Sequence, residues 1–286
     1  MIYTIKNDLL TCDVSTLGAE IQSVKCIKTE KEFMWEGREF WQKHAPLLFP
    51  ICGSITSPYT YHGKEYFMEK HGFISDLDFD AVSVSDSELI LSVKENDATL
   101  AAYPFAFEFT AKYILDGNRL VSEYTVKNNS GEVMPYMLGL HPAFALHGDA
   151  PKEEFCLDFG TPFTVKQYRL SAPFVNQTGF DREFPSGRLY ITNEIYEKGT
   201  IILGKTKSSI DFLSPAGKVF RMEWSDNFRN LCVWKWTDDK ARYVCIEPWT
   251  NIPSDGSKTD DLDEKKMQRL KVGGENKYSY AVEFCL

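Results

Sequence analysis

The feature that most constrains this chain is a succession of short strand-like segments separated by turns, without sustained helical periodicity. Residues 105–115 alternate around aromatic side chains, Asp116-Gly117-Asn118 supplies a turn, and residues 119–126 continue with β-branched and aromatic residues, as in a hairpin. A second hairpin is expected at residues 59–67, turning at His62-Gly63. Further strands are predicted at residues 82–84, 89–93, 201–203, 209–213, 219–224, 231–236, 243–246 and 278–284. The pattern predicts an all-β fold, one large antiparallel β-sandwich domain over residues 1–286.

Two short segments have some helical character. The first is residues 99–103. The second, residues 261–270, begins with acidic residues and continues with basic ones, which complements a helix dipole. The same composition suits a solvated loop, so helix and loop both remain open for this second segment.

Charge and hydropathy narrow the classes of partner. The chain carries 32 basic and 41 acidic residues, a net charge of −9, and no basic cluster, which argues against nucleic acid and against anionic membranes. The longest run without charged or polar side chains, residues 45–53, is too short to span a bilayer. The first eight residues lack the plan of a signal peptide. We therefore expect a cytoplasmic protein. Its aromatic content of 14% suits both strands and sugar-stacking surfaces.

The cysteines predict reduced thiols and no metal. There are seven, an odd number, and no pair has metal-ligand or redox-motif spacing. Most lie beside apolar residues, which is typical of buried thiols in a cytosolic protein. No His-x-x-x-His or Cys-x-x-Cys pair is present, so zinc is not expected.

Three polar residues lie in apolar surroundings: His71 in KHGF, His141 in GLHPAF and Glu247 in CIEPW. Two imidazoles and one carboxylate suit acid–base chemistry near neutral pH. Each precedes Gly or Pro, which predicts a position at the end of a strand. Either histidine could instead be a structural residue of the core. Glu247 fits that alternative least well, because burying a carboxylate is costly unless it is paired or serves a function.

Five segments follow one another along nearly the whole chain. They are residues 17–24 (LGAEIQSV), 41–53 (WQKHAPLLFPICG), the HGF motif at 71–73, residues 128–144 with MPY and GLHPAF, and residues 245–249 (CIEPW). Together they resemble the aldose 1-epimerase (galactose mutarotase) superfamily, most closely its LacX-like branch. Each motif alone is weak, but five in the same order are fairly specific.

The resemblance implies a galactose mutarotase-like supersandwich and an isomerase of carbohydrate metabolism that interconverts the α and β anomers of a free aldose without a cofactor. Glu247 would be the general base for the anomeric hydroxyl, His141 the general acid for the ring oxygen, and His71 a hydrogen-bond partner of the sugar. This scheme requires an ionised carboxylate and a protonated imidazole, with pKa values on either side of the working pH. The expected partner is a hexose, and the expected state is a monomer or homodimer.

Two departures from the family pattern bear on the substrate. Ser54 follows Gly53 where the family often has Arg, and Ser75 stands where the branch often has Arg. Serine cannot replace the bidentate hydrogen bonds of Arg, which weakens the case for a sugar phosphate and favours an altered sugar. The remaining candidates for substrate binding are Trp41, His44, Ser54, Asp76 and Trp249.

Two other functions compete with this one. A non-catalytic carbohydrate-binding or sensor protein on the same fold would be consistent with the two missing arginines. A glycoside hydrolase would need two carboxylates flanking the glycosidic bond, for which Asp76 and Glu247 are the available pair. Fold alone does not decide among these functions.

Overall fold

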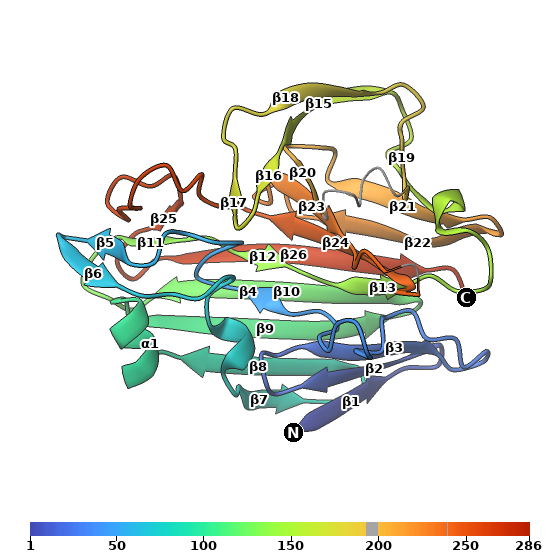
Figure 1. Cartoon of the computed structure of the whole chain (residues 1–286). Coiled ribbons are helices and arrows are strands. Elements are labelled where there is room, and N and C mark those ends of the chain that lie inside the picture. Colours follow the sequence, from blue (N-terminus) through green and yellow to red (C-terminus); the bar gives the residue numbers. More distant parts are fainter. Residues whose placement is uncertain (193–199, 239) are drawn as a thin grey trace.

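The computed structural model describes residues 1–192, 200–238 and 240–286 and shows two large antiparallel sheets packed face to face (Figure 1). The first sheet has nine described strands, in the spatial order β19 (Arg188–Tyr190), β14 (Cys156–Asp158), β21 (Ser209–Ser214), β22 (Gly217–Trp224), β26 (Glu275–Phe284), β10 (Arg119–Asn128), β9 (Phe107–Asp116), β8 (Glu88–Lys94) and β7 (Asp80–Val84). The predicted all-β sandwich is confirmed.

The second large sheet carries the functional strands. Its described order is β18 (Phe180–Phe184), β15 (Phe163–Tyr168), β20 (Thr200–Leu203), β23 (Asn230–Trp234), β24 (Tyr243–Trp249), β12 (Gly139–Leu140) and β4 (Leu47–Leu48), with β13 (Ala143–Ala145) also paired to β24. A smaller three-stranded sheet consists of β1 (Ile2–Lys6), β2 (Leu10–Ser15) and β3 (Ile21–Cys26). The remaining described strands form two-stranded sheets: β5 (Tyr59–Tyr61) with β6 (Lys64–Tyr66), β16 (Leu170–Ser171) with β17 (Phe174–Val175), and β11 (Met134–Tyr136) with β25 (Gln268–Leu270).

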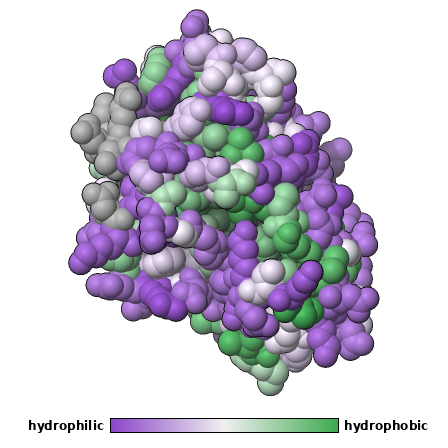
Figure 2. Space-filling model, turned by 90° about the vertical axis from the view of Figure 1, so that its right-hand side faces the viewer, coloured by the Kyte–Doolittle hydropathy of each residue, from purple (hydrophilic) through white to green (hydrophobic). Residues whose placement is uncertain are grey.

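The alternation seen in the sequence places the core between the two large sheets. In β9, every second residue is buried, and Phe107, Phe109 and Tyr113 are fully so. A shift of one residue in register would turn these aromatic rings to the other face, so the pattern fixes the pairing of β9 with β10 and β8. On the face seen in Figure 2, hydrophilic residues predominate and apolar residues gather in patches between them.

The two helical candidates have different outcomes. Residues 99–103 fall largely in α1 (Asp97–Ala102), where Asn96 and Thr99 form a reciprocal capping box. Residues 261–270 form turns and the strand β25 instead of a helix. The guanidinium of Arg269 donates to the carbonyls of Leu262, Asp263 and Lys265, which satisfies backbone groups that a helix would have bonded internally. Two short 3-10 turns are also present, at Ile74–Asp76 and Lys152–Glu154.

Strand β24 is buried along its whole length because both of its faces are covered. Val244 and Ile246 point into the main core. Tyr243 and Cys245, on the opposite face, belong to a second apolar cluster that includes Trp41 and Trp234. The described residues contain no helix that is long and apolar enough to cross a membrane. All seven cysteines are free thiols, and six are buried, as the sequence predicted.

Candidate active site

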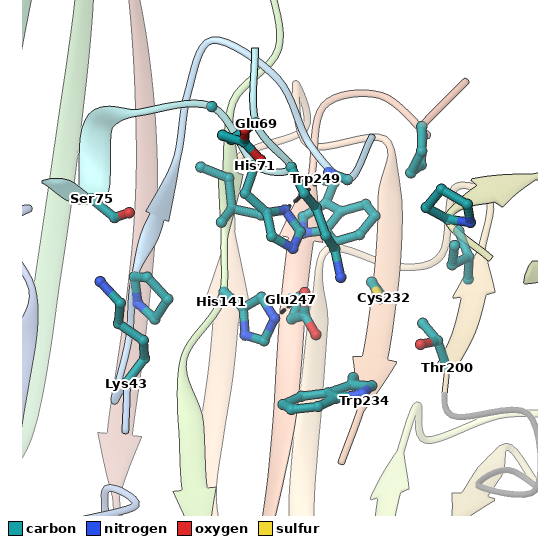
Figure 3. A pocket seen from close by; sticks show the side chains of 18 of the residues that line it. Lys43, Glu69, His71, Ser75, His141, Thr200, Cys232, Trp234, Glu247 and Trp249 are labelled. Atoms are coloured by element: carbon teal, nitrogen blue, oxygen red, sulfur yellow. Dashed lines mark hydrogen bonds and ion pairs between the residues drawn. The ribbon is translucent and has the colours of Figure 1, made fainter. Parts of the chain in front are cut away.

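A cavity of about 520 Å³ opens beside β24 and brings the three polar residues together (Figure 3). His71, His141 and Glu247 all line it, although they come from three segments far apart in the sequence. The rings of His71 and His141 are nearly perpendicular, with centroids 5.7 Å apart. His141 Nε2 lies 3.4 Å from Glu247 Oε2. The cavity therefore brings two imidazoles and the buried Glu247 carboxyl within reach of a single small ligand.

Glu247 lies inside β24 and not at its end, so the sequence prediction for its position is wrong. The strand continues through Pro248 to Trp249. The N–H groups of Ile246 and Thr250 donate to the carbonyls of Pro142 and Leu138, on the side of β24 that faces β12 and β13. Because alternate nitrogens of a strand face the same side, the nitrogen of Pro248 also points to this side. It lies opposite the gap between β12 and β13, where no ladder hydrogen bond is needed, so the strand tolerates a proline.

His141 follows directly after β12, as the sequence predicted. Its backbone N–H donates to the carbonyl of Pro46. The ring is 8% exposed and lies against Trp41 (centroids 4.9 Å apart) and Trp234 (5.6 Å). These contacts place Nε2 toward Glu247, while Nδ1 has no hydrogen-bond partner among the described residues.

His71 occupies a turn with a left-handed backbone (φ 72°) and is tied to Gly53 twice. Its N–H donates to the Gly53 carbonyl at 2.8 Å, and its Nδ1 accepts from the Gly53 N–H at 3.0 Å. Because Nδ1 accepts this bond, the proton of the neutral ring is on Nε2. Glycine is required at position 72, since a Cβ there would lie 2.2 Å from the Phe49 carbonyl oxygen. His71 therefore presents a fixed N–H donor to the cavity.

Burial sets the protonation states of Glu247, His141 and His71. These states are the reverse of the ionised carboxylate and protonated imidazole that the sequence predicts. Burial raises the pKa of Glu247 to about 8, opposed in part by the charge of Lys70. Burial lowers the pKa of His141 to about 3. Burial also lowers the pKa of His71 well below its usual value, with His141 and Lys70 adding to the effect. In the empty cavity at neutral pH, the carboxyl is therefore protonated and the imidazoles are neutral.

Glu247 is the most deeply buried of the three polar residues. Its side chain is 1% exposed, and the groups next to its oxygens are the Cys232 thiol, the Trp249 indole and His141 Nε2, the last 3.4 Å from Oε2. Burying a carboxyl costs folding free energy, which makes Glu247 the leading candidate for a functional group in this cavity.

The other predicted substrate-binding residues divide into two groups. Trp41, Asp76 and Trp249 line the cavity, with Asp76 exposed near its rim. His44 and Ser54 do not line it. The His44 ring lies against Gly37, where an added Cβ would come within 2.5 Å of it, and Ser54 belongs to a buried segment whose carbonyl accepts from Ser254. Both have neighbours in the sequence that reach the cavity while their own side chains do not.

Several lining residues were not predicted from the sequence. Lys43 and Lys70 bring two positive charges to the cavity, and Trp234 and Cys232 add an aromatic and a thiol wall from β23. Lys70 directly precedes His71, and Trp234 lies two residues from Cys232 in a predicted strand, so both segments had been recognised. What the sequence did not reveal was which side chain of each segment faces the cavity.

The fold and the cavity together define a galactose mutarotase-like sandwich whose cavity is lined by His71, His141 and Glu247. The aldose 1-epimerase family model matches residues 1–256, and the chain belongs to this family. It is 30% identical to the chromosomal LacX protein of Lactococcus lactis subsp. lactis, covering 95% of each chain.

Two solved structures share the fold closely. A galactose mutarotase related enzyme from Lactobacillus acidophilus is 31% identical, with a TM-score of 0.91 over 100% of this chain and 98% of the other. A galactose mutarotase-like protein from Lactobacillus casei is 28% identical, with a TM-score of 0.91 over 100% of both chains. The resemblance seen in the sequence motifs is thereby confirmed at the level of family and fold.

Proposed function

We propose that this protein is a cytoplasmic aldose 1-epimerase that interconverts the α and β anomers of a free hexose, acting as a monomer or homodimer. The observation that carries the proposal is the buried Glu247 carboxyl 3.4 Å from His141 in a cavity that His71 also lines. Ring opening needs one group to take the proton of the anomeric hydroxyl and another to protonate the ring oxygen. The Glu247–His141 pair holds the single proton that this exchange requires.

The proton begins on Glu247 in the empty cavity, because burial favours the neutral pair. Sugar hydroxyls entering the cavity replace part of the lost solvation of both groups. This favours transfer of the proton to His141, which leaves an ionised carboxylate beside a protonated imidazole. Glu247 then takes the proton from O1 while His141 gives its proton to the ring oxygen, and the ring opens to the aldehyde. Rotation about C1–C2 and the reverse transfers close the ring as the other anomer.

His71 supports the same step without changing its protonation. Its Nδ1 is occupied by the Gly53 N–H, so Nε2–H is a fixed donor to the ring oxygen or a neighbouring hydroxyl. Such a preorganised donor stabilises charge that develops in the transition state. Trp41, Trp234 and Trp249 supply apolar walls for the C–H faces of the sugar.

The alternative is a sugar-binding protein that does not catalyse. Mutarotation of freshly dissolved α-D-glucose and α-D-galactose, followed by polarimetry, separates the two functions. Binding is measured in parallel from the fluorescence of the tryptophans that line the cavity. Acceleration above the buffer rate supports the enzyme, whereas saturable fluorescence change without acceleration on any aldose tested supports the binding protein.

A further inference from the structure

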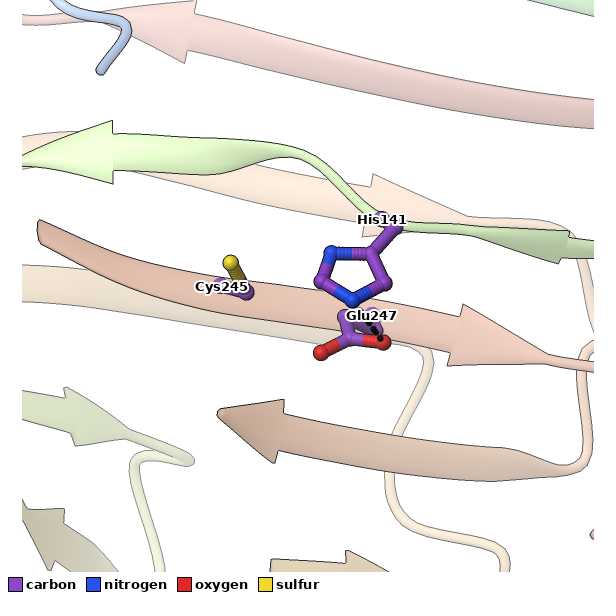
Figure 4. Close-up of side chains that lie close together, drawn as sticks. All are labelled: His141, Cys245 and Glu247. Carbon is purple, nitrogen blue, oxygen red and sulfur yellow. Dashed lines mark ion pairs between the residues drawn. The ribbon is translucent and has the colours of Figure 1, made fainter. Parts of the chain in front are cut away.

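We infer that His141, Cys245 and Glu247 form a site for one thiophilic divalent cation, Zn²⁺ or Cd²⁺, and that the bound cation blocks the proton-transfer pair. The binding part of this inference stands independently, and only its inhibitory consequence rests on the proposed function. The three side chains come from two neighbouring segments of the second large sheet (Figure 4).

The geometry is close to that of a zinc site. Cys245 and Glu247 are two residues apart in β24 and so share one face of the strand, and His141 approaches from the segment between β12 and β13. One donor atom from each residue lies within 4.8 Å of the other two, and His141 Nε2 is 3.4 Å from Glu247 Oε2. Tetrahedral zinc places its ligand atoms about 3.3–3.8 Å apart. A movement of about 1 Å by the thiol, within the reach of a side-chain rotation, therefore completes the set.

The donors are free to bind. Around Glu247 lie the Cys232 thiol and the Trp249 indole, which are neutral hydrogen-bond donors, so a cation displaces weak contacts and no ion pair with Lys or Arg among the described residues. His141 and Glu247 line the open cavity, while Cys245 lies behind them and does not line it. A cation entering through the cavity reaches the imidazole and the carboxylate first and the sulfur last.

Charge and ligand type select the cation. One thiolate and one carboxylate carry two negative charges, which balance the charge of a divalent cation. This balance matters because the site is buried, and burying a net charge is costly. Sulfur and imidazole ligands favour Zn²⁺ or Cd²⁺ over Mg²⁺ and Ca²⁺, which take oxygen ligands. Binding releases the thiol proton and the carboxyl proton. Glu247 can then no longer accept a proton from a sugar, so the cation is an inhibitor and not a cofactor.

Cys245 is the residue that separates metal binding from catalysis. The chelator-treated full chain is titrated with Cd²⁺, and the ultraviolet thiolate-to-metal charge-transfer band is followed. Wild type and Cys285→Ser, which removes the partly exposed thiol outside the site, are each expected to bind one equivalent with this band. In Cys245→Ser the band should disappear and the Cd²⁺ affinity should fall at least about 100-fold. Cys245→Ala provides the same test should the serine disturb folding.

This titration does not need enzymatic activity. A missing band in wild type, a band that persists in Cys245→Ser, or a band that is lost in Cys285→Ser each overturns the inferred site. The inhibitory role is tested by mutarotation in the presence of Zn²⁺. Wild type should be inhibited by Zn²⁺ and recover with a chelator, whereas the rate of Cys245→Ser, taken relative to its own metal-free rate, should not fall when Zn²⁺ is added. Equal inhibition of both proteins contradicts inhibition through this site.

Discussion

Two buried carboxyl groups show how differently this fold treats a charge. Asp260, 9% exposed, accepts from the Thr56 N–H at 2.8 Å and the Ser254 hydroxyl at 2.9 Å, and pairs with the Lys265 ammonium at 2.7 Å. Glu247, 1% exposed, has the Cys232 thiol, the Trp249 indole and the His141 ring next to its oxygens, and no Lys or Arg pairs with it among the described residues. The chain can therefore satisfy a buried carboxylate where it serves structure. Leaving Glu247 without a cationic partner keeps it available to a ligand.

The largest expected effect is on catalysis. Glu247→Gln should lower kcat/KM for mutarotation by about 10³-fold or more, because the amide keeps the size of the side chain but cannot exchange the proton. Asp260→Asn should retain at least about half of wild-type activity in the folded fraction, since Asp260 does not line the cavity. Polarimetry on both variants, with circular dichroism to check folding, makes the comparison. Equal losses in the two variants would remove the functional distinction between these carboxyl groups.

The free energy of unfolding should distinguish the two variants in the opposite order: Glu247→Gln should be stabilised and Asp260→Asn destabilised. Glu247 has its pKa raised from 4.5 to about 8 in the folded state, so the stability it contributes is full below about pH 4.5 and is lost as pH rises through about 8. Glutamine cannot ionise, so Glu247→Gln should stabilise the fold by on the order of 3 kcal/mol at pH 9 and by little at pH 4.

Asp260→Asn should instead destabilise by about 2–4 kcal/mol, because it leaves the Lys265 ammonium without its partner. Denaturant titrations of both variants at the two pH values measure this. A destabilised Glu247→Gln at pH 9 would show that the carboxylate has partners that stabilise it.

The two histidines of the GLHPAF and WQKHAP motifs provide a smaller, matched comparison. His141→Asn should reduce kcat by about 10²–10³-fold, since His141 faces Glu247 in the cavity. His44→Asn should leave kcat within about twofold of wild type, since the His44 side chain does not line the cavity. Rates measured side by side decide this. A loss of kcat in His44→Asn as large as that in His141→Asn would show that His44 contributes to the substrate site after all.

The smallest expected effect concerns Lys70, whose charge lowers the pKa of Glu247. Lys70→Met removes this charge and should move the alkaline limb of kcat/KM upward by roughly 0.5 pH unit. Lys64→Met, on the exposed strand β6, is the control and should leave the limb in place. A downward movement in Lys70→Met would contradict the direction of the coupling.

The strands and the three polar residues were predictable because their signals are local. Alternation in β9 and turn residues after it fix a hairpin, and an acidic residue between Ile246 and Pro248 is unexpected in a buried strand. The family resemblance then supplied their order. The sequence did not indicate Cys245 as a metal ligand, because zinc motifs are usually recognised by the spacing of ligands on helices or loops. Here Cys245 and Glu247 are two residues apart on a strand, which places both side chains on the same face.

The protonation states were not predictable from the sequence. They depend on how completely tertiary packing removes water from Glu247 and His141, which no local pattern records. The exclusion of His44 and Ser54 from the cavity has the same origin, since neighbouring residues on an irregular segment point in different directions.

The pH dependence of kcat/KM for mutarotation in wild type is the most direct test of the role assigned to the Glu247–His141 pair. Activity requires exactly one proton on the pair, so we expect a plateau that is lost above about pH 8, as Glu247 ionises, and below about pH 3, as His141 is protonated. A narrow bell with limbs near the ordinary values of a carboxyl and an imidazole, 4.5 and 6.5, would contradict it. Such a bell would show that the two groups act from solvated, ionised states.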